Sequence, residues 1–300
     1  MPDEDFEQVK GDLFDALLQR SFEVHAVEEV KSGLYFEPPL EGEGEFHLLF
    51  DENDRDILMH RDAHFASSFP IMIEYYENEG KGAVLDVEIE RIRELELLQK
   101  ELGRDIAPFV LQGSDAEKIA RARSLYKELR RAYEEAIAPL MKLVALLILS
   151  EEEEFDVAAF VPFGSKAVTC LLQLVQTDEL YDPLFPGYGM AALLACRALG
   201  KLKAKEAIPI LFSLIGRVDF DIESEVIEAL AAIGDEAKAF LLKALVARPF
   251  GADNERACVA LSQFLPDAQI KETVKTLACL KEVQEKKTLV RYLQNLYQDV

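Results

Sequence analysis

The chain has 300 residues, half of them apolar, and a formal net charge of −23. So many apolar residues can form a sizeable core, which excludes an intrinsically disordered protein. The acidity argues against a protein that wraps nucleic acid, because such binding depends on lysine and arginine side chains that neutralise phosphates.

The acidic residues are concentrated near the N-terminus. Residues 1–79 contain 21 acidic and 5 basic side chains, a net charge of −16, and the other 221 residues carry −7. The first residues, MPDEDFEQVKGDLFDALL, are acidic where a secretory signal requires positive charge. The most apolar run, residues 136–149, is shorter than a bilayer span and contains Lys142. We therefore expect a soluble cytoplasmic protein that binds neither membranes nor nucleic acid.

Residues 1–113 are predicted to form a separate acidic region, either helical or α+β. The spacing of apolar residues predicts helices over 3–31, 63–79 and 84–102, with Gly103 ending the last. Within residues 34–60, the runs LYFEPP, EFHLLF and DILMH are separated by the turn-rich EGEGE and DENDR. This alternation predicts a short β meander.

The strongest candidate for metal binding is DILMHRDAH, residues 56–64. If this segment is helical, Asp56, His60 and His64 follow one another at intervals of four residues and share one face, which is usable spacing for metal ligands. The alternative is a polar junction with solvated side chains. Nucleotide-binding and catalytic motifs such as GxGxxG, GxSxG and HExxH are absent from the sequence, so we expect neither a cofactor nor a catalytic residue.

A second region, residues 114–300, is predicted to be helical throughout. Its first helix opens with Ser114 and Glu117 at the spacing of a capping box. The same helix carries a basic strip that is either a solvated face or a docking site for an acidic surface; its members are Lys118, Arg121, Arg123, Lys127, Arg130 and Arg131. Further helices are expected over 134–149, 164–176 and 284–298.

Three segments of this region align on one pattern: LACRALGKL at 194–202, EALAAIGDE at 228–236 and RACVALSQF at 256–264. The joints fall at Gly200, Gly234 and Ser262, and an apolar-periodic helix follows each joint. Glycine at a joint suits a left-handed helix end, after which a new helix can double back. The pattern predicts stacked antiparallel helix pairs, with the cysteines reduced and buried in the core.

The run ALGKLKAKEAIPILFSLI resembles a HEAT repeat, and particularly the short form found in phycobilisome lyases and many bacterial scaffolds. The resemblance is clear over residues 188–282. It implies an all-α fold, a right-handed α–α superhelix of the HEAT type, with the second helix of each pair lining a concave face where partners bind. Ser262 in place of a third glycine and the insert TDELYDPLFPGYG at 177–189 depart from the repeat pattern.

Candidate partner-binding residues follow from this resemblance. Between the expected core positions, the second helices and their ends carry Lys205, Arg217, Lys238, Lys243, Lys271 and Lys275. These cations either form a groove that favours binding of anions or are ordinary solvated side chains. The insert contributes Tyr181, Phe185 and Tyr188, which either project an aromatic contact near the groove or plug the solenoid between unequal units.

The sequence therefore predicts a non-enzymatic scaffold or adaptor that binds another protein, of unknown identity, on the concave face. The alternative is an enzyme that handles a bilin or another small molecule, which only the resemblance suggests. DNA-repair glycosylases with HEAT-like repeats are a third class, disfavoured by the acidity and by the absence of tryptophan. The sequence does not predict an oligomeric state.

Overall fold

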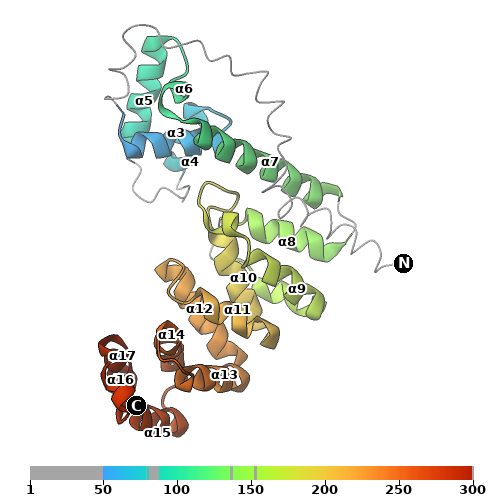
Figure 1. The fold of residues 1–300 in the computed structure, drawn as a ribbon. Coiled ribbons are helices and arrows are strands. Elements are labelled where there is room, and N and C mark those ends of the chain that lie inside the picture. The colour runs from blue at the N-terminus through green and yellow to red at the C-terminus, as the bar shows by residue number, and fades with distance from the viewer. Residues whose placement is uncertain (1–49, 79, 81–87, 136–137, 152–153, 299–300) are drawn as a thin grey trace. The chain divides into compact units, whose positions relative to one another are not determined.

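The computed structural model describes residues 50–78, 80, 88–135, 138–151 and 154–298 (Figure 1). All regular structure in these ranges is helical, which confirms the predicted all-α fold. The chain divides into two compact units, one of residues 1–153 with 177–191 and one of residues 154–176 with 192–300. The boundary predicted between residues 113 and 114 lies within the first unit.

The first unit is built from six α-helices and a short 3-10 helix among its described residues. They are α3 (Glu52–His64), α4 (Phe69–Glu77), α5 (Ile89–Leu102), α6 (Ala107–Val110), α7 (Gly113–Glu135), α8 (Pro139–Leu149) and η4 (Asp178–Tyr181). Helix α3 packs on α6 and α7, α4 packs on α5, and α7 packs on α8. A core of α3 to α6 holds these helices together; it consists of Ile57, Leu58, Phe65, Phe69, Met72, Ile92, Leu95, Ile106 and Ala107.

The predicted β meander is wrong over residues 56–60, which belong to α3. The helix begins at Asp51, whose side chain accepts a hydrogen bond from the backbone of Asp54 and completes a capping box. The acidic run read as a turn is therefore a helix N-terminus, where carboxylates are stabilised by unpaired N–H groups. Residues 34–49 of the meander and the helix predicted over 3–31 lie outside the described residues.

The two helices predicted over 63–79 and 84–102 are α4 and α5, with shorter bounds. Ala66 and Ser67 have positive φ angles of 51° and 60°, which end α3 before Ser68 caps α4. Gly103 ends α5 in the left-handed conformation, as predicted. Helix α7 begins at Gly113, and the side chain of Asp115, rather than that of Glu117, accepts a hydrogen bond from the backbone N–H of Gln112. The capping residues therefore lie two positions earlier than the predicted pair.

Buried ion pairs also join the helices of this unit. Asp54, which is fully buried, accepts two hydrogen bonds of 2.7 Å from Arg91 of α5. Arg61 is fully buried, donates to Asp105 and Gln99, and lies over the ring of Phe69. A buried ion pair is tolerated when its geometry satisfies both partners, so these pairs fix how α3 meets α5.

The second unit consists of helix pairs that follow one another along the chain. Its elements are η3 (Val157–Phe163), α9 (Ser165–Leu174), α10 (Met190–Lys201, whose first two residues belong to the first unit), η5 (Lys205–Ala207), α11 (Ile208–Leu214), α12 (Phe220–Ile233), α13 (Asp235–Val246), α14 (Ala252–Leu261), η6 (Ser262–Phe264), α15 (Ala268–Ala278), α16 (Lys281–Gln284) and α17 (Lys287–Gln298). Within this unit α11 packs on α12, α13 on α12 and α14, and α17 on α14 and α15 (Figure 1). This is the nearest-neighbour packing of a helical repeat stack.

The three predicted joints differ in structure. Gly234 ends α12 with φ 93°, so of the two glycine joints only this one has the predicted positive φ. Gly200 lies inside α10, and the turn comes later, at Lys203 with φ 51°. Ser262 has a right-handed helical conformation and continues into η6. Helices α12 and α13 pack against each other across the Gly234 joint, and a second helix also follows α10 and α14. The succession of helices is therefore as predicted, although two of the joints lie elsewhere.

Gly200 has a packing role instead. A Cβ atom at this position would lie 2.8 Å from Cα of Ala229 and 3.1 Å from its Cβ. Helices α10 and α12 therefore approach one another backbone to backbone at this point. The contact on α12 is made by Ala229, whereas Ala232 of the same helix is exposed.

The predicted core positions of the second helices are confirmed. All nine are buried: Ile208, Leu211, Phe212, Ile215, Leu241, Leu245, Ile270, Val274 and Leu277. Cys170, Cys196 and Cys258 are free and buried, as predicted, whereas Cys279 is free but exposed. Burial raises the pKa of the Cys196 and Cys258 thiols to about 12, so both remain protonated small core side chains.

Candidate functional site

The predicted basic residues of the second helices are partly used to join neighbouring repeats. Lys205 of η5 donates to Glu236 of α13. Lys238 of α13 lies 3.1 Å from Asp267, the residue that caps α15, and 3.3 Å from Asp235. The carboxylates raise the pKa of Lys238 above its ordinary value. These two lysines therefore form ion pairs between successive helix pairs, and their charge is compensated.

A shallow groove lies between α13 and α15, which are second helices of successive pairs. Its volume is about 570 Å³, and its lining residues are Asp235, Lys238, Ala239, Leu242, Lys243, Val246, Gln269 and Thr273. The groove thus includes two of the predicted residues, Lys238 and Lys243, although the apolar part of its lining was not predicted as a site.

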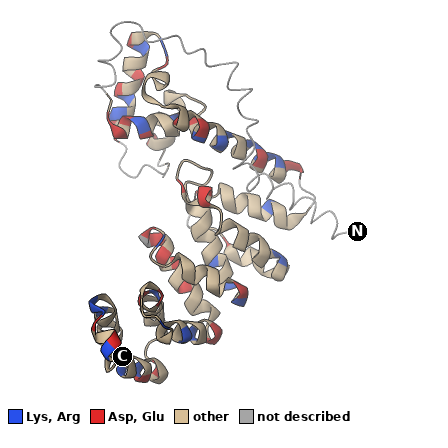
Figure 2. Cartoon of the chain, viewed as in Figure 1, with Lys and Arg blue, Asp and Glu red and all other residues tan. Residues whose placement is uncertain are grey.

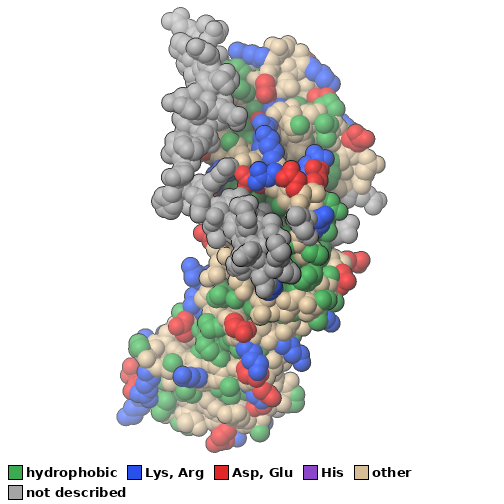
Figure 3. Space-filling model, turned by 90° about the vertical axis from the view of Figure 1, so that its right-hand side faces the viewer, with side chains coloured by type: hydrophobic (Ala, Val, Ile, Leu, Met, Phe, Trp, Pro, Cys, Tyr) green, Lys and Arg blue, Asp and Glu red, His purple; other side chains and the backbone are tan. Residues whose placement is uncertain are grey.

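Within this groove an apolar side chain and a cation face solvent together. Val246 is 46% exposed, and Lys243, one helical turn earlier, is exposed with no ion-pair partner among the described residues. Figure 3 shows small hydrophobic areas lying among charged side chains on the face that it draws. The α13–α15 groove combines the same two kinds of contact.

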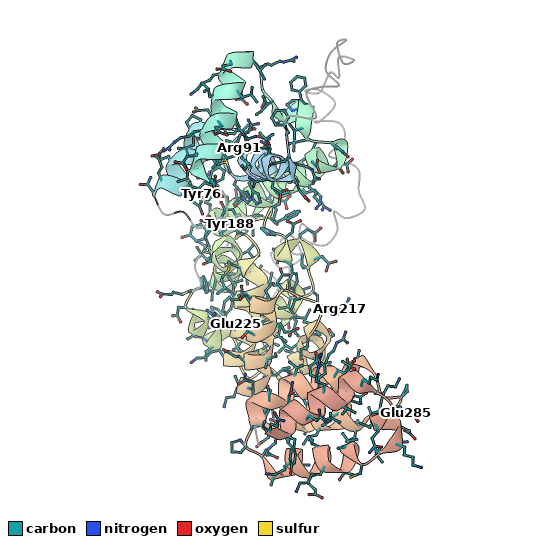
Figure 4. All side chains as sticks on the ribbon, turned by 90° about the vertical axis from the view of Figure 1, so that its left-hand side faces the viewer. Tyr76, Arg91, Tyr188, Arg217, Glu225 and Glu285 are labelled. Atoms are coloured by element: carbon teal, nitrogen blue, oxygen red, sulfur yellow. The ribbon has the colours of Figure 1, made fainter. Side chains whose placement is uncertain are left out.

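The other predicted cations do not line this groove. Lys271 of α15 lies over the ring of Tyr297 of α17, with its ammonium 5.7 Å from the ring centroid. Lys275 is exposed on α15, and Arg217 is exposed in the turn after α11 (Figure 4). The structure therefore does not bring all six predicted cations together in one site.

The aromatic insert does not project into solvent. Phe185 is buried, with the guanidinium of Arg121 of α7 lying 5.6 Å from its ring centroid. Tyr188 packs on His64 of α3, and Tyr181 is half-buried at the end of η4. The insert also forms ion pairs with the basic strip of α7, Glu179 with Arg121 and Asp182 with Lys118. Two residues of the strip, Lys118 and Arg121, thus bind acidic side chains of their own unit. Figure 2 shows basic and acidic residues along α7.

The three candidate metal ligands meet the condition of the hypothesis, a helical segment, but their side chains do not converge on one point. Asp56, His60 and His64 all lie on α3, yet the rings of His60 and His64 are stacked, with centroids 5.3 Å apart and planes at 12°. An imidazole binds a metal in the plane of its ring, so two nearly parallel stacked rings do not converge on one ion. Among the described residues, no group of three histidine, cysteine, aspartate or glutamate side chains is arranged to hold a metal ion.

Instead, the two histidines belong to an aromatic cluster within the first unit. Nδ1 of His64 lies 2.8 Å from the hydroxyl oxygen of Tyr126 of α7. On the other side, Tyr188 packs against His64 and Tyr75, and Tyr75 packs against Tyr76 of α4 (Figure 4 labels Tyr76 and Tyr188). Sequence reasoning missed this cluster, although the adjacent pair at 75–76 was a visible signal, because its members come from four separate segments.

Burial determines the protonation of this cluster. It lowers the pKa of His60 to about 4. Burial, together with repulsion from His60, lowers the pKa of His64 to about 3. Burial also raises the pKa of Tyr76 to about 12 and raises the pKa of Tyr126 and Tyr188. At neutral pH the entire cluster is therefore uncharged.

Stacked helix pairs with a groove on their second helices define an α-solenoid, the class of helical-repeat proteins. Residues 190–262 match the family model for HEAT repeats, so this segment is built from HEAT repeats, as its resemblance implied. The match does not include the N-terminal third. HEAT repeats form helical scaffolds that typically bind other proteins. No curated protein and no solved structure matches the chain.

None of the described helices combines the length and the apolar character that crossing a membrane requires. Helix α8, which is largely apolar, has only 11 residues.

Proposed function

We propose that this protein is an interaction scaffold that binds a segment of another protein in the α13–α15 groove. The observation that supports this function most directly is the position of the groove, which lies on second helices within or next to the matched HEAT repeats. Second helices line the binding face of such stacks, and successive repeats extend this face into a surface suited to an elongated partner.

The chemistry of the groove restricts the partner. Leu242, Ala239 and Val246 offer an apolar strip along α13, and Lys243 adds a positive charge beside it. The α15 side contributes the neutral polar residues Gln269 and Thr273. An amphipathic segment with apolar side chains at helical spacing and a carboxylate next to them complements this surface. The partner that we propose is therefore an acidic amphipathic peptide segment.

Selection of peptides from a displayed random library on the full-length protein tests the proposal. We expect enriched peptides to combine apolar residues with aspartate or glutamate. Val246→Asp and Lys243→Glu should each weaken their binding about tenfold or more, since residues that fill the centre of an interface dominate its affinity. Isothermal titration of a selected peptide measures both changes.

Two exposed residues outside the groove provide matched controls. Val161 of η3 is 49% exposed, close to the value for Val246, and Lys281 of α16 is exposed as Lys243 is. Val161→Asp and Lys281→Glu should leave peptide binding unchanged. The proposal is wrong if no peptide is enriched, or if enriched peptides bind Val246→Asp and Lys243→Glu as tightly as the original protein.

A further inference from the structure

The insert and the residues that follow it form a segment that crosses the first unit, and we call residues 177–191 the strap. The strap contacts α3 through Tyr188 and His64, whose ring centroids are 4.5 Å apart. It contacts α7 through two ion pairs and through Phe185, which lies against Arg121. It passes so close to α8 that a Cβ atom at Gly187 would lie 2.1 Å from the carbonyl oxygen of Ile148.

The backbone of the strap is held in an uncommon conformation at its most closely packed point. Gly187, Tyr188 and Gly189 have φ angles of 78°, 50° and 82°. A tyrosine in this region costs conformational energy unless surrounding contacts favour it. The contacts of the Tyr188 ring with His64 and Tyr75 therefore help to hold this part of the strap in place.

The histidines beneath the strap are poorly placed to take up a second proton. His60 is 8% exposed, and its Nδ1 has no hydrogen-bond partner among the described residues. Nε2 of His64 is buried and likewise makes no hydrogen bond of normal geometry within the described part of the chain. The backbone of Pro183 and Leu184 favours a charged His64, but burial and the neighbouring His60 outweigh this effect. A charged imidazole in such a position lacks solvation, and two stacked charged rings repel one another.

We propose that the strap is a pH-sensitive latch, closed over neutral His60 and His64 and released from α3 when these two imidazoles are protonated. Opening exposes both rings to water, where an imidazolium is stable. The open form therefore binds protons more strongly than the closed form, and acid shifts the population towards it.

The charged and titratable groups around the histidines are consistent with opening at acidic pH. On α3 Asp56 is exposed, and on the strap Asp182 attracts a proton on His60 only weakly compared with the effect of burial. Glu151, after α8, accepts a hydrogen bond from Tyr75. Of the titratable groups on the elements packed against the pair, Tyr126 of α7 and Tyr188 of the strap contact His64 directly, and Tyr75 of α4 contacts Tyr188. The same elements also carry Tyr76, Lys118, Arg121, Glu179 and Tyr181. No carboxylate among the described residues forms an ion pair with either imidazole.

Hydrogen exchange of the full-length protein tests the latch. Backbone protection of peptides from residues 177–191 is compared at pH 7.2 and 5.2, with labelling times scaled for the intrinsic pH dependence of exchange. Protection should fall by roughly tenfold or more, since each histidine favours the open form by up to roughly twentyfold at the lower pH. Peptides from α13 and α14 should keep their protection, which distinguishes strap opening from global unfolding.

A double variant identifies the protons responsible. His60→Phe keeps a stacked ring that cannot be protonated, and His64→Asn keeps a polar atom near the Tyr126 hydroxyl. This variant should show the same protection of the strap at both pH values. Glu179→Gln with Asp182→Asn removes the acidic contacts of the strap instead and should retain the pH response.

Two results would overturn the proposal: unchanged protection in the original protein, or an equal loss of protection in the histidine double variant. If the histidine double variant does not fold, an NMR titration of the four histidine C2 protons in the original protein serves as the test instead. If all four then titrate near pH 6.5, the latch does not exist. A latch that fails in these measurements leaves the peptide-binding result at the α13–α15 groove unaffected.

Discussion

At the scale of single residues, position in the packing decides what a residue does. Gly200 was predicted from its place in the repeat pattern to be a helix end, and it is instead a contact point between two helices. The role of Asn254 is likewise set by its contacts: it is buried, and its side-chain amide donates to three carbonyls at the end of α13, those of Ala244, Leu245 and Ala247. The sequence by itself does not show which atoms these residues contact.

Replacing Gly200 by alanine should destabilise the protein. Alanine favours a helix over glycine by about 1 kcal/mol, but the added methyl would meet the backbone of Ala229 and force α10 and α12 apart. Overpacking of this kind costs about 1–3 kcal/mol, so the net free energy of unfolding should fall. Chemical denaturation monitored by circular dichroism measures the change.

Gly113 is the matched control for this substitution. An added Cβ at Gly113 would meet nothing within 4 Å. Gly113→Ala should therefore leave the free energy of unfolding the same or slightly higher. Equal or higher stability of Gly200→Ala would show that the contact between α10 and α12 is not as close as described.

At the scale of helices, charges that looked like parts of a binding face are shared between repeats. Lys205 with Glu236 and Lys238 with Asp267 connect successive helix pairs, and Arg197 of α10 donates in the same way to Glu225 of α12. These pairs join residues that are 28 to 31 positions apart. Their spacing matches the repeat period, because equivalent positions of neighbouring repeats lie next to one another.

Charge reversal should therefore have different effects on the melting temperature at two lysines of the same helix, Lys238 and Lys243. Lys238→Glu places a carboxylate beside Asp267 and Asp235 and should lower the melting temperature measurably. Lys243→Glu breaks no ion pair among the described residues and should leave the melting temperature nearly unchanged while weakening peptide binding. Differential scanning calorimetry at low and high salt should show the difference shrinking as salt screens the charges. Equal melting temperatures at low salt would contradict the role assigned to Lys238.

At the scale of the whole molecule, stability should depend on pH through the buried histidines. Their folded-state pKa values, about 4 and about 3, lie below the ordinary 6.5. The unfolded chain then takes up protons first, so this contribution is complete above pH 6.5 and is lost as the pH falls towards 4 and 3. The loss should reach on the order of a few kcal/mol for the pair.

Urea denaturation between pH 7.5 and 5.0 measures this loss in a range where most carboxylates stay ionised. Over that range the midpoint should fall for the original protein and much less for His60→Phe with His64→Asn. If the two proteins show parallel pH profiles, buried histidines are not the cause. At lower pH a further decrease is expected from Asp115, whose pKa is held below its ordinary value by the hydrogen bond from Arg55.

Several features followed from the sequence by itself: most of the helices from 69 onwards, the nine core positions of the repeats, the buried state of Cys170, Cys196 and Cys258, and the HEAT resemblance. These depend on apolar residues recurring with the helical period, which is a local property. Local errors were the joints placed at Gly200 and Ser262 and a strand predicted over 56–60. The strand was predicted because an acidic N-cap was read as a turn. Such an error is possible where a short apolar run fits both the two-residue period of a strand and the 3.6-residue period of a helix.

Only the tertiary structure decided which of the candidate residues act together. It paired Lys205 and Lys238 with carboxylates of the neighbouring repeat, left Lys243 beside the exposed Val246, and placed Tyr188 against His64 rather than in solvent. It also brought Tyr75, Tyr126 and the strap to α3 from distant parts of the chain. The physical reason is that ion pairing, stacking and desolvation depend on distance in space, which periodicity within one helix does not encode.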